Sequence, residues 1–189
     1  MSDGKTPAEL LEAHYERVTG LEGESYRVSE DDVSPAVFAT LYRGFPRAGA
    51  SAGFTFGLFN SHSPANEGHP HRELVICMAS DDPSWVLAVG YLAVQLRGRC
   101  GFDSGDTINF RAEVARGSRM SAFVVLHPLV LRPADAEVDI GIRRVSLRQL
   151  VPLYEEERAW LMAGGEEQLL MEQFTADDLM DPGRRALRT

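Results

Sequence analysis

The sequence predicts an α/β (α+β) fold in which a mixed β-sheet sandwich is flanked by helices. Short apolar runs rich in β-branched and aromatic residues fill the middle of the chain, as strands require. Patterns of helical spacing occur near both ends and once in the middle. The 189 residues show no internal repeat, and a hydrophobic fraction of 44% is ordinary for a globular protein. We therefore expect one compact domain overall.

The first predicted element is a helix in the segment TPAELLEAHYERVTG. Thr6 is a good capping residue, Pro7 suits the first helical position, and Glu9 completes a capping box. Gly20 supplies the C-terminal stop. The acidic stretch over residues 22–33 then predicts a solvated connection to the rest of the chain.

The next segments are assigned from their apolar patterns. Residues 35–46 fit a short helix or a strand about equally, and the small residues of 47–53 predict a turn. The alternating, aromatic-rich segment 54–60 predicts a strand. A polar loop over 61–72 leads into the apolar run 73–80, which predicts a buried strand.

The segment DDPSWVLAVGYLAVQLRG is the clearest helix. Asp82 is predicted to cap it, Pro83 to open it and Gly98 to close it. Trp85 lies one turn in, on the same face as Val89. We therefore expect Trp85 to be a core anchor rather than a residue that stacks on a ligand.

The remainder of the chain continues the mixture of strands and helices. Three apolar runs predict strands, at residues 107–110, 120–131 and 139–150. Residues 153–174 predict one or two short amphipathic helices, broken at Gly164–Gly165. The polar tail 178–187 has room for one more helical turn.

Charge and composition exclude several classes of protein. The formal net charge is −9 and the sequence pI about 5.0, which argues against nucleic acid as a partner because phosphates require a basic face. The N-terminus is polar and acidic, unlike a signal peptide, and no apolar run is long enough to span a membrane. The two cysteines do not make a disulfide framework. We expect a cytoplasmic protein.

The segment GHPHREL carries the residues that most resemble a chemical site. A metal site would combine His62, His69, His71 and Glu73. However, Pro70 separates two of these ligands, and no helical HExxH frame is present. We therefore expect a polar loop that leads into a strand, with no bound metal and no cofactor. A metal-dependent hydrolase built on this loop remains the less favoured alternative.

Two further motifs favour structural interpretations. Ser51 lies in GASAG, which matches the pattern of a nucleophile elbow, but a strand-like segment follows where the elbow requires a helix. Asp103 and Asp106 flank Gly105, and this pairing is typical of a tight turn as well as of a cation site. We expect turns at both places.

Several segments together resemble the suppressor of fused (SUFU-like) domain family, especially its bacterial members. The resemblance runs in order from about residue 35 to residue 187, and it is carried by the stretches GFTFGLF, RELVICMASDDPSWVLAVGYLAVQLRGRCGFDSGDTINF, MSAFVVLHPLVL, VSLRQLVPLYEEERAWLMAGGEEQLL and DLMDPGRRAL. It implies a compact α/β sandwich and favours a strand for residues 36–43. It also implies a division into an N-terminal helix with an acidic connection, 1–34, and a SUFU-like domain, 35–189.

The resemblance implies a non-catalytic protein-binding domain. Bacterial members look like immunity proteins that neutralise polymorphic toxins, and eukaryotic members include a repressor that sequesters a transcription factor. We therefore expect a protein partner, either a toxin or another intracellular protein. Four carboxylates on the predicted C-terminal helices are candidates for the rim of the binding surface: Glu155, Glu156, Glu166 and Glu167.

Overall fold

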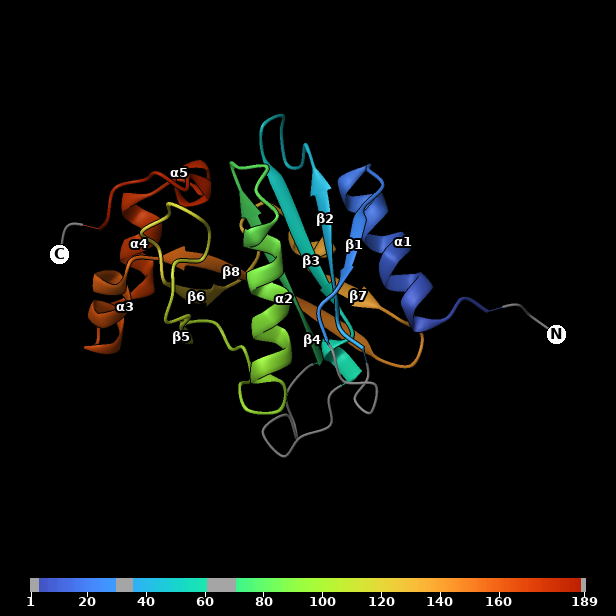
Figure 1. Cartoon of the computed structure of the whole chain (residues 1–189). Coiled ribbons are helices and arrows are strands. Elements are labelled where there is room, and N and C mark those ends of the chain that lie inside the picture. The colour runs from blue at the N-terminus through green and yellow to red at the C-terminus, as the bar shows by residue number, and fades with distance from the viewer. Residues whose placement is uncertain (1–3, 30–35, 61–70, 188–189) are drawn as a thin grey trace.

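The computed structural model describes residues 4–29, 36–60 and 71–187. Within these residues, one eight-stranded sheet carries helices on both of its faces (Figure 1). The strands are β1 (Glu24–Arg27), β2 (Phe38–Arg43), β3 (Ser51–Phe56), β4 (His71–Met78), β5 (Thr107–Asn109), β6 (Ala122–Leu126), β7 (Glu137–Asp139) and β8 (Arg144–Leu153). The helices are α1 (Pro7–Thr19), α2 (Ser84–Leu96), α3 (Glu155–Met162), α4 (Glu167–Gln173) and α5 (Ala176–Met180), with 3-10 turns η1 (Leu58–Asn60) and η3 (Pro133–Asp135).

The strand order confirms the predicted mixed sheet. The order is β1-β2-β3-β4-β8-β6-β5, and β7 pairs with β8 beside this path. Every pairing is antiparallel except that of β4 with β8, which is parallel. Parallel neighbours need a crossover connection, and here α2 lies within that connection. The helix α2 covers one face of the sheet, α1 packs on the opposite face, and α3–α5 lie together at one end of the molecule (Figure 1).

The helix α1 begins and ends as predicted. The Glu9 carboxylate accepts a hydrogen bond from the backbone N–H of Thr6 at 2.6 Å, and the Thr6 hydroxyl accepts one from the backbone N–H of Glu9 at 3.3 Å. Gly20 ends the helix in the left-handed conformation, with φ of 69°. Leu11 and Tyr15 are buried against the sheet, so the apolar face predicted from helical spacing is the one that packs.

The acidic stretch after α1 is not only a solvated connection, because it contains the edge strand β1. Residues Glu24–Arg27 pair antiparallel with β2, and three of the four side chains are exposed. The apolar pattern that predicts a strand is missing here because neither face of β1 is fully buried. The backbone hydrogen bonds to β2 hold it in the sheet instead.

The segments around β2 and β3 partly correct the sequence assignments. Residues Phe38–Arg43 form a strand, as the family resemblance implies. The strand β3 already begins at Ser51, inside the predicted turn, and it ends at Phe56, where Gly57 at φ 105° turns the chain into η1. Small residues are needed in β3 because α2 lies close: a Cβ on Gly53 would approach Val86 within 2.5 Å.

The helix α2 starts two residues later than Asp82, and its cap differs slightly from the prediction. The structure makes Pro83 the N-cap residue, while the Asp82 carboxylate accepts a hydrogen bond from the backbone N–H of Ser84 at 2.9 Å. The helix ends at Leu96, before Gly98. Asp82 therefore stabilises the first turn as expected, from one position further out.

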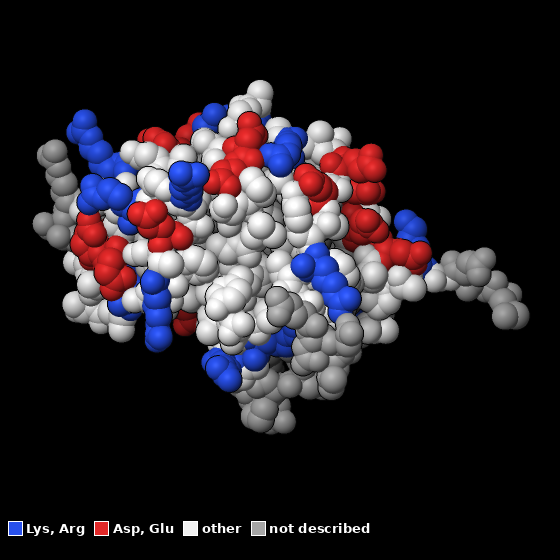
Figure 2. Space-filling model, in the orientation of Figure 1, with Lys and Arg blue, Asp and Glu red and all other residues white. Residues whose placement is uncertain are grey.

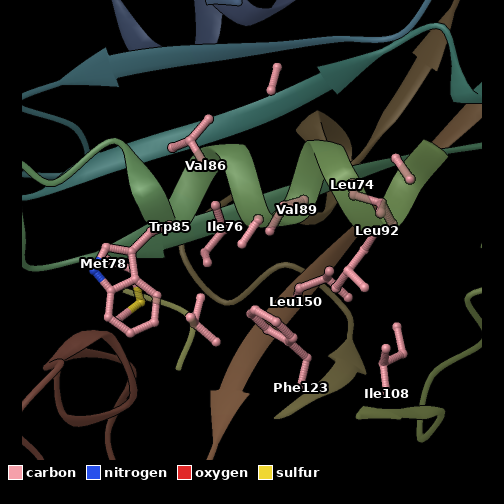
Figure 3. Packing of buried hydrophobic residues seen from close by; sticks show 14 of the residues in the cluster. Leu74, Ile76, Met78, Trp85, Val86, Val89, Leu92, Ile108, Phe123 and Leu150 are labelled. Atoms are coloured by element: carbon pink, nitrogen blue, oxygen red, sulfur yellow. The ribbon is translucent and has the colours of Figure 1, made fainter. Parts of the chain in front are cut away.

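Trp85 is buried in the main hydrophobic core, with 3% of its surface exposed. Figure 3 shows its indole beside Met78 of β4, with Val89 and Leu92 further along the same helix. The predicted placement of Trp85 as a core residue is confirmed.

The C-terminal third divides differently from the sequence prediction. The single strand predicted at residues 139–150 is two strands, β7 and β8, joined by a tight turn in which Gly141 has a φ of 82°. The expected break at Gly164–Gly165 separates α3 from α4, and the tail contains the short helix α5. No helix among the described residues has the length and apolar character needed to cross a bilayer.

Candidate functional site

The histidine segment is only partly within the described residues. His62 and His69 lie outside them, whereas His71 begins β4 and its Nδ1 lies 3.0 Å from the backbone oxygen of Phe59. Nη1 of Arg143 lies 3.2 Å from Nε2 of the same ring. Within residues 4–29, 36–60 and 71–187, no three His, Cys, Asp or Glu side chains are grouped so as to hold a metal ion. The prediction of no bound metal stays a prediction, because two of its four residues are not described.

Glu73 is completely buried and ties β4 to the turn that follows β3. Its carboxylate accepts hydrogen bonds from the Thr55 hydroxyl at 2.5 Å and from the backbone N–H groups of Gly57 and Phe59, both at 2.9 Å. Burial raises the pKa of Glu73 to about 7, although these donors oppose the shift. Glu73 is thus a structural carboxyl that holds the end of β3 and the turn η1 against β4.

The raised pKa makes the contribution of Glu73 to folding depend on pH. The folded pKa lies above the ordinary value of 4.5, so the contribution is complete below about pH 4.5 and is lost as pH rises through about 7. Glu73→Gln keeps the shape and removes the ionisation. We expect the variant to gain about 3 kcal/mol relative to the parent between pH 4.5 and 7.5, measured by urea unfolding. Parallel pH profiles for the two proteins would contradict this expectation.

The structure gives Ser51 and the two aspartates structural roles. The Ser51 hydroxyl donates to Asp81 at 3.4 Å from within a strand, so no nucleophile elbow is formed. Asp103 and Asp106 lie in a turn in which the Asp106 N–H donates to the Asp103 carbonyl at 3.0 Å. Nη2 of the largely buried Arg72 donates to Asp103 at 2.5 Å, which holds this turn against β4.

The four candidate rim carboxylates do not form one uniform surface. Glu155 is engaged by Arg158 at 2.5 Å, and the half-buried Glu167 lies 3.5 Å from the Ser104 hydroxyl. Glu156 and Glu166 are exposed, and their side chains have no hydrogen bond or ion pair with any described residue. Figure 2 shows acidic and basic side chains intermixed over the end of the molecule formed by α3–α5. Their role in binding stays a prediction.

The sequence interpretation missed the neighbour of these residues, Glu157. Its side chain is fully buried and forms a two-pronged ion pair with Arg184, at 2.6 and 2.7 Å. It also accepts hydrogen bonds from the backbone N–H groups of Tyr154 and Leu187. Three consecutive glutamates indicated only a favourable helix start. The helical position of Glu157, four residues after the end of β8, was the available signal for its inward orientation.

A groove on the other side of the molecule was not predicted at all. It lies between α1 and the β1–β2 edge of the sheet, and it has a volume of about 350 Å³. Its lining combines three carboxylates with four aromatic rings: Glu12, Glu16, Glu22, Tyr15, Phe38, Tyr42 and Phe56. Figure 2 shows acidic side chains gathered over α1, in contrast to the mixed charges over α3–α5.

Comparison with known proteins identifies the relatives of this fold. The family model described as "Suppressor of fused protein (SUFU)" matches residues 39–185. A crystal structure of a suppressor of fused homologue from Neisseria gonorrhoeae is similar at a TM-score of 0.77 and 14% identity, covering 96% of this chain and 97% of that one. A crystal structure of the Sufu–Fu complex is similar at a TM-score of 0.69 and 15% identity, covering 96% and 92%. No curated protein sequence matches the chain.

At these identities the solved structures establish the fold, and the family model establishes the family. The matched residues include seven of the eight strands, from the second residue of β2 onward, and all helices except α1. The strands and helices that build the core are therefore those of the family. The chain belongs to the suppressor of fused protein family.

Proposed function

We propose that this protein binds another protein and catalyses no reaction, and that it acts in the bacterial cytoplasm as an immunity protein against a toxin. The observation that carries the protein-binding part is the family membership, together with the similar fold of Sufu in the Sufu–Fu complex. The acidity of the chain supports a basic partner, because opposite charges steer encounter.

The proposed function is tested directly with a partner that is selected from the neighbouring genes. The product of an adjacent toxin gene is titrated with the purified protein, and the toxin's activity is measured in parallel. We expect saturable binding and loss of toxin activity at equimolar ratio. Binding to a neighbour-encoded protein without any effect on toxicity would replace the immunity role by sequestration of another regulatory partner. Saturable turnover of a small substrate, lost when His71 is replaced, would instead favour a hydrolase that uses His62, His69 and His71.

The rim carboxylates predict how binding responds to salt. Screening shortens the reach of surface charge to about 8 Å at physiological ionic strength, so association should slow as salt is added while dissociation changes little. Glu156→Gln together with Glu166→Gln should lower the association rate a few-fold, because both carboxylates are exposed and have no partner among the described residues. The measurement is stopped-flow association at two salt concentrations. Rates that are independent of both salt and these substitutions would reject the electrostatic part.

A further inference from the structure

One wall of the groove beside α1 is acidic, because the spacing of the glutamates along the helix places them on the same side. Glu12 and Glu16 are four residues apart, so they lie on the same face of α1, and Glu22 follows in the connection to β1. All three side chains are exposed, and none forms a hydrogen bond or an ion pair with any described residue. By contrast, Arg17 on the same helix is already held by Asp135 at 3.0 Å. The wall therefore presents carboxylates whose charge is not balanced locally.

The floor of the groove is the face of the sheet that α1 leaves uncovered. Alternate residues of β2 point to this face, which places Phe38 and Tyr42 in the lining with Thr40 between them. Thr40 is hydrogen-bonded to Ser25 of β1 at 2.8 Å. The groove therefore joins aromatic ring surface to a row of small polar groups.

Tyr42 is the most informative residue of the floor. Its side chain is 1% exposed and lines the groove, and its hydroxyl has no hydrogen-bond partner among the described residues. The hydroxyl is not one of the fully enclosed unpaired polar atoms of the described residues, so it is available to a group that enters the groove. Burial raises the pKa of Tyr42 well above its ordinary value, and the charges of Glu16 and Glu12 raise it further, so both carboxylates lie near it. The backbone can pass over the Tyr42 ring at residue 23 only because this residue is glycine. A Cβ there would lie 2.7 Å from Cζ of Tyr42.

We propose that this groove binds an arginine or lysine side chain carried on a basic segment of a protein partner. This inference rests on the proposed protein-binding function and assigns it a surface and a partner chemistry. The carboxylates of α1 would neutralise the cation, the aromatic rings would contact it and its alkyl stem, and the Tyr42 hydroxyl would accept one of its N–H groups. The volume lies at the lower end of the range of roughly 300–1,000 Å³ that is usual for ligand pockets, enough for one long side chain.

Charge selects this occupant over the alternatives. An acidic or phosphorylated segment would be repelled by three unpaired carboxylates, and an apolar segment would bury them without compensation. A second copy of the chain carries the same net charge of −9 and is therefore repelled overall. A basic segment of a different protein is the occupant that offsets the cost of burying these groups.

The test uses two matched probes and the full-length protein. The first is a capped heptapeptide of alternating glycine and arginine, and the second replaces each arginine by citrulline, which keeps the shape and removes the charge. Backbone amide resonances are followed by NMR during titration. We expect the arginine peptide to give saturable shifts concentrated in the groove-lining residues of α1, β1 and β2, and the citrulline peptide to give none there.

Two pairs of substitutions separate a built site from general acidity. Glu12→Gln with Glu16→Gln should weaken binding of the arginine peptide about ten-fold, which corresponds to about 1.4 kcal/mol for the two exposed carboxylates together. Glu113→Gln with Glu172→Gln changes the net charge equally at exposed positions outside the groove, and it should change the affinity by less than about two-fold. Tyr42→Phe removes only the hydroxyl and should weaken binding several-fold without loss of stability.

The outcomes distinguish this inference from the function on which it rests. Equal weakening by the two double variants, shifts outside the groove, or equal binding of the citrulline peptide would overturn the groove assignment. Groove shifts that depend on protein concentration without peptide would overturn it in favour of self-association. If the partner from the neighbouring gene binds the Glu12→Gln and Glu16→Gln variant as tightly as the parent, the groove fails while the proposed function stands. If no partner binds the parent, the proposed function fails.

Discussion

Replacing Glu157 with alanine is expected to destabilise the protein by about 3–5 kcal/mol, because it leaves the buried Arg184 guanidinium without its counter-charge. The side chains of this pair are 0% and 2% exposed. The guanidinium also donates to the Pro152 carbonyl at 3.0 Å and lies over the rings of Tyr154 and Phe174, so it cannot move into water without dismantling the end of the fold. Chemical denaturation of parent and variant measures the difference.

The control for this prediction lies two residues away on the same helix. Glu155→Ala removes an exposed carboxylate paired with Arg158, and such pairs contribute at most about 1 kcal/mol. Replacing both buried partners by apolar residues, Glu157→Leu with Arg184→Met, should recover much of the loss, because no charge is then left unpaired. A Glu157→Ala variant as stable as Glu155→Ala would show that the pair contributes little to this fold.

Replacing Trp85 with alanine is expected to cost about 3–5 kcal/mol through the cavity that it leaves between α2 and β4. Trp85 is 3% exposed and packs in the largest hydrophobic cluster, beside Met78 (Figure 3). For a chain of this length the loss corresponds to a melting temperature lower by roughly 6–20 °C. Thermal unfolding followed by circular dichroism provides the measurement.

Tyr91 supplies a matched aromatic control on the same helix. Its side chain is 53% exposed and touches Phe110 only edge to face, with ring centroids 6.1 Å apart. Tyr91→Ala should therefore cost roughly 1 kcal/mol. If Trp85→Ala melts within a few degrees of the parent, or no lower than Tyr91→Ala, Trp85 is not the core anchor that its position indicates.

The sequence predicted correctly those helices and strands that are marked by capping residues, glycines or apolar runs within the same segment. Thr6, Glu9 and Gly20 define α1, and the glycine pair at 164–165 separates α3 from α4. Apolar runs predicted β4 and β6 because both strands are buried along their length. Elements without such a signal were missed: β1 is an exposed edge strand, and the division of β7 from β8 depends on pairing between the two.

For the candidate sites, what the sequence predicts differs even more clearly from what depends on tertiary contacts. For the segment GHPHREL, the sequence itself favours a polar loop over a metal site. Pro70 and the absence of a helical HExxH frame argue against the geometry that metal ligands require. The burial of Glu73, with donors from residues up to 18 positions away, could not be predicted from its own neighbours. The groove could not be predicted from the sequence either, because Glu12 and Tyr42 become neighbours only when α1 packs on the sheet.

The sequence by itself determined the class of the fold, the caps of its first helix, the core position of Trp85 and, through several matching segments together, the family. Those properties depend on spacing and residue type within short stretches. Only the tertiary structure decided which carboxylates are buried and paired and which are exposed. Glu157 and Glu73 are buried against distant partners, whereas Glu12 and Glu16 face a groove with their charges unpaired among the described residues. The physical reason is that the fate of a charge depends on the groups that surround it in space, and those groups come from strands and helices remote in the chain.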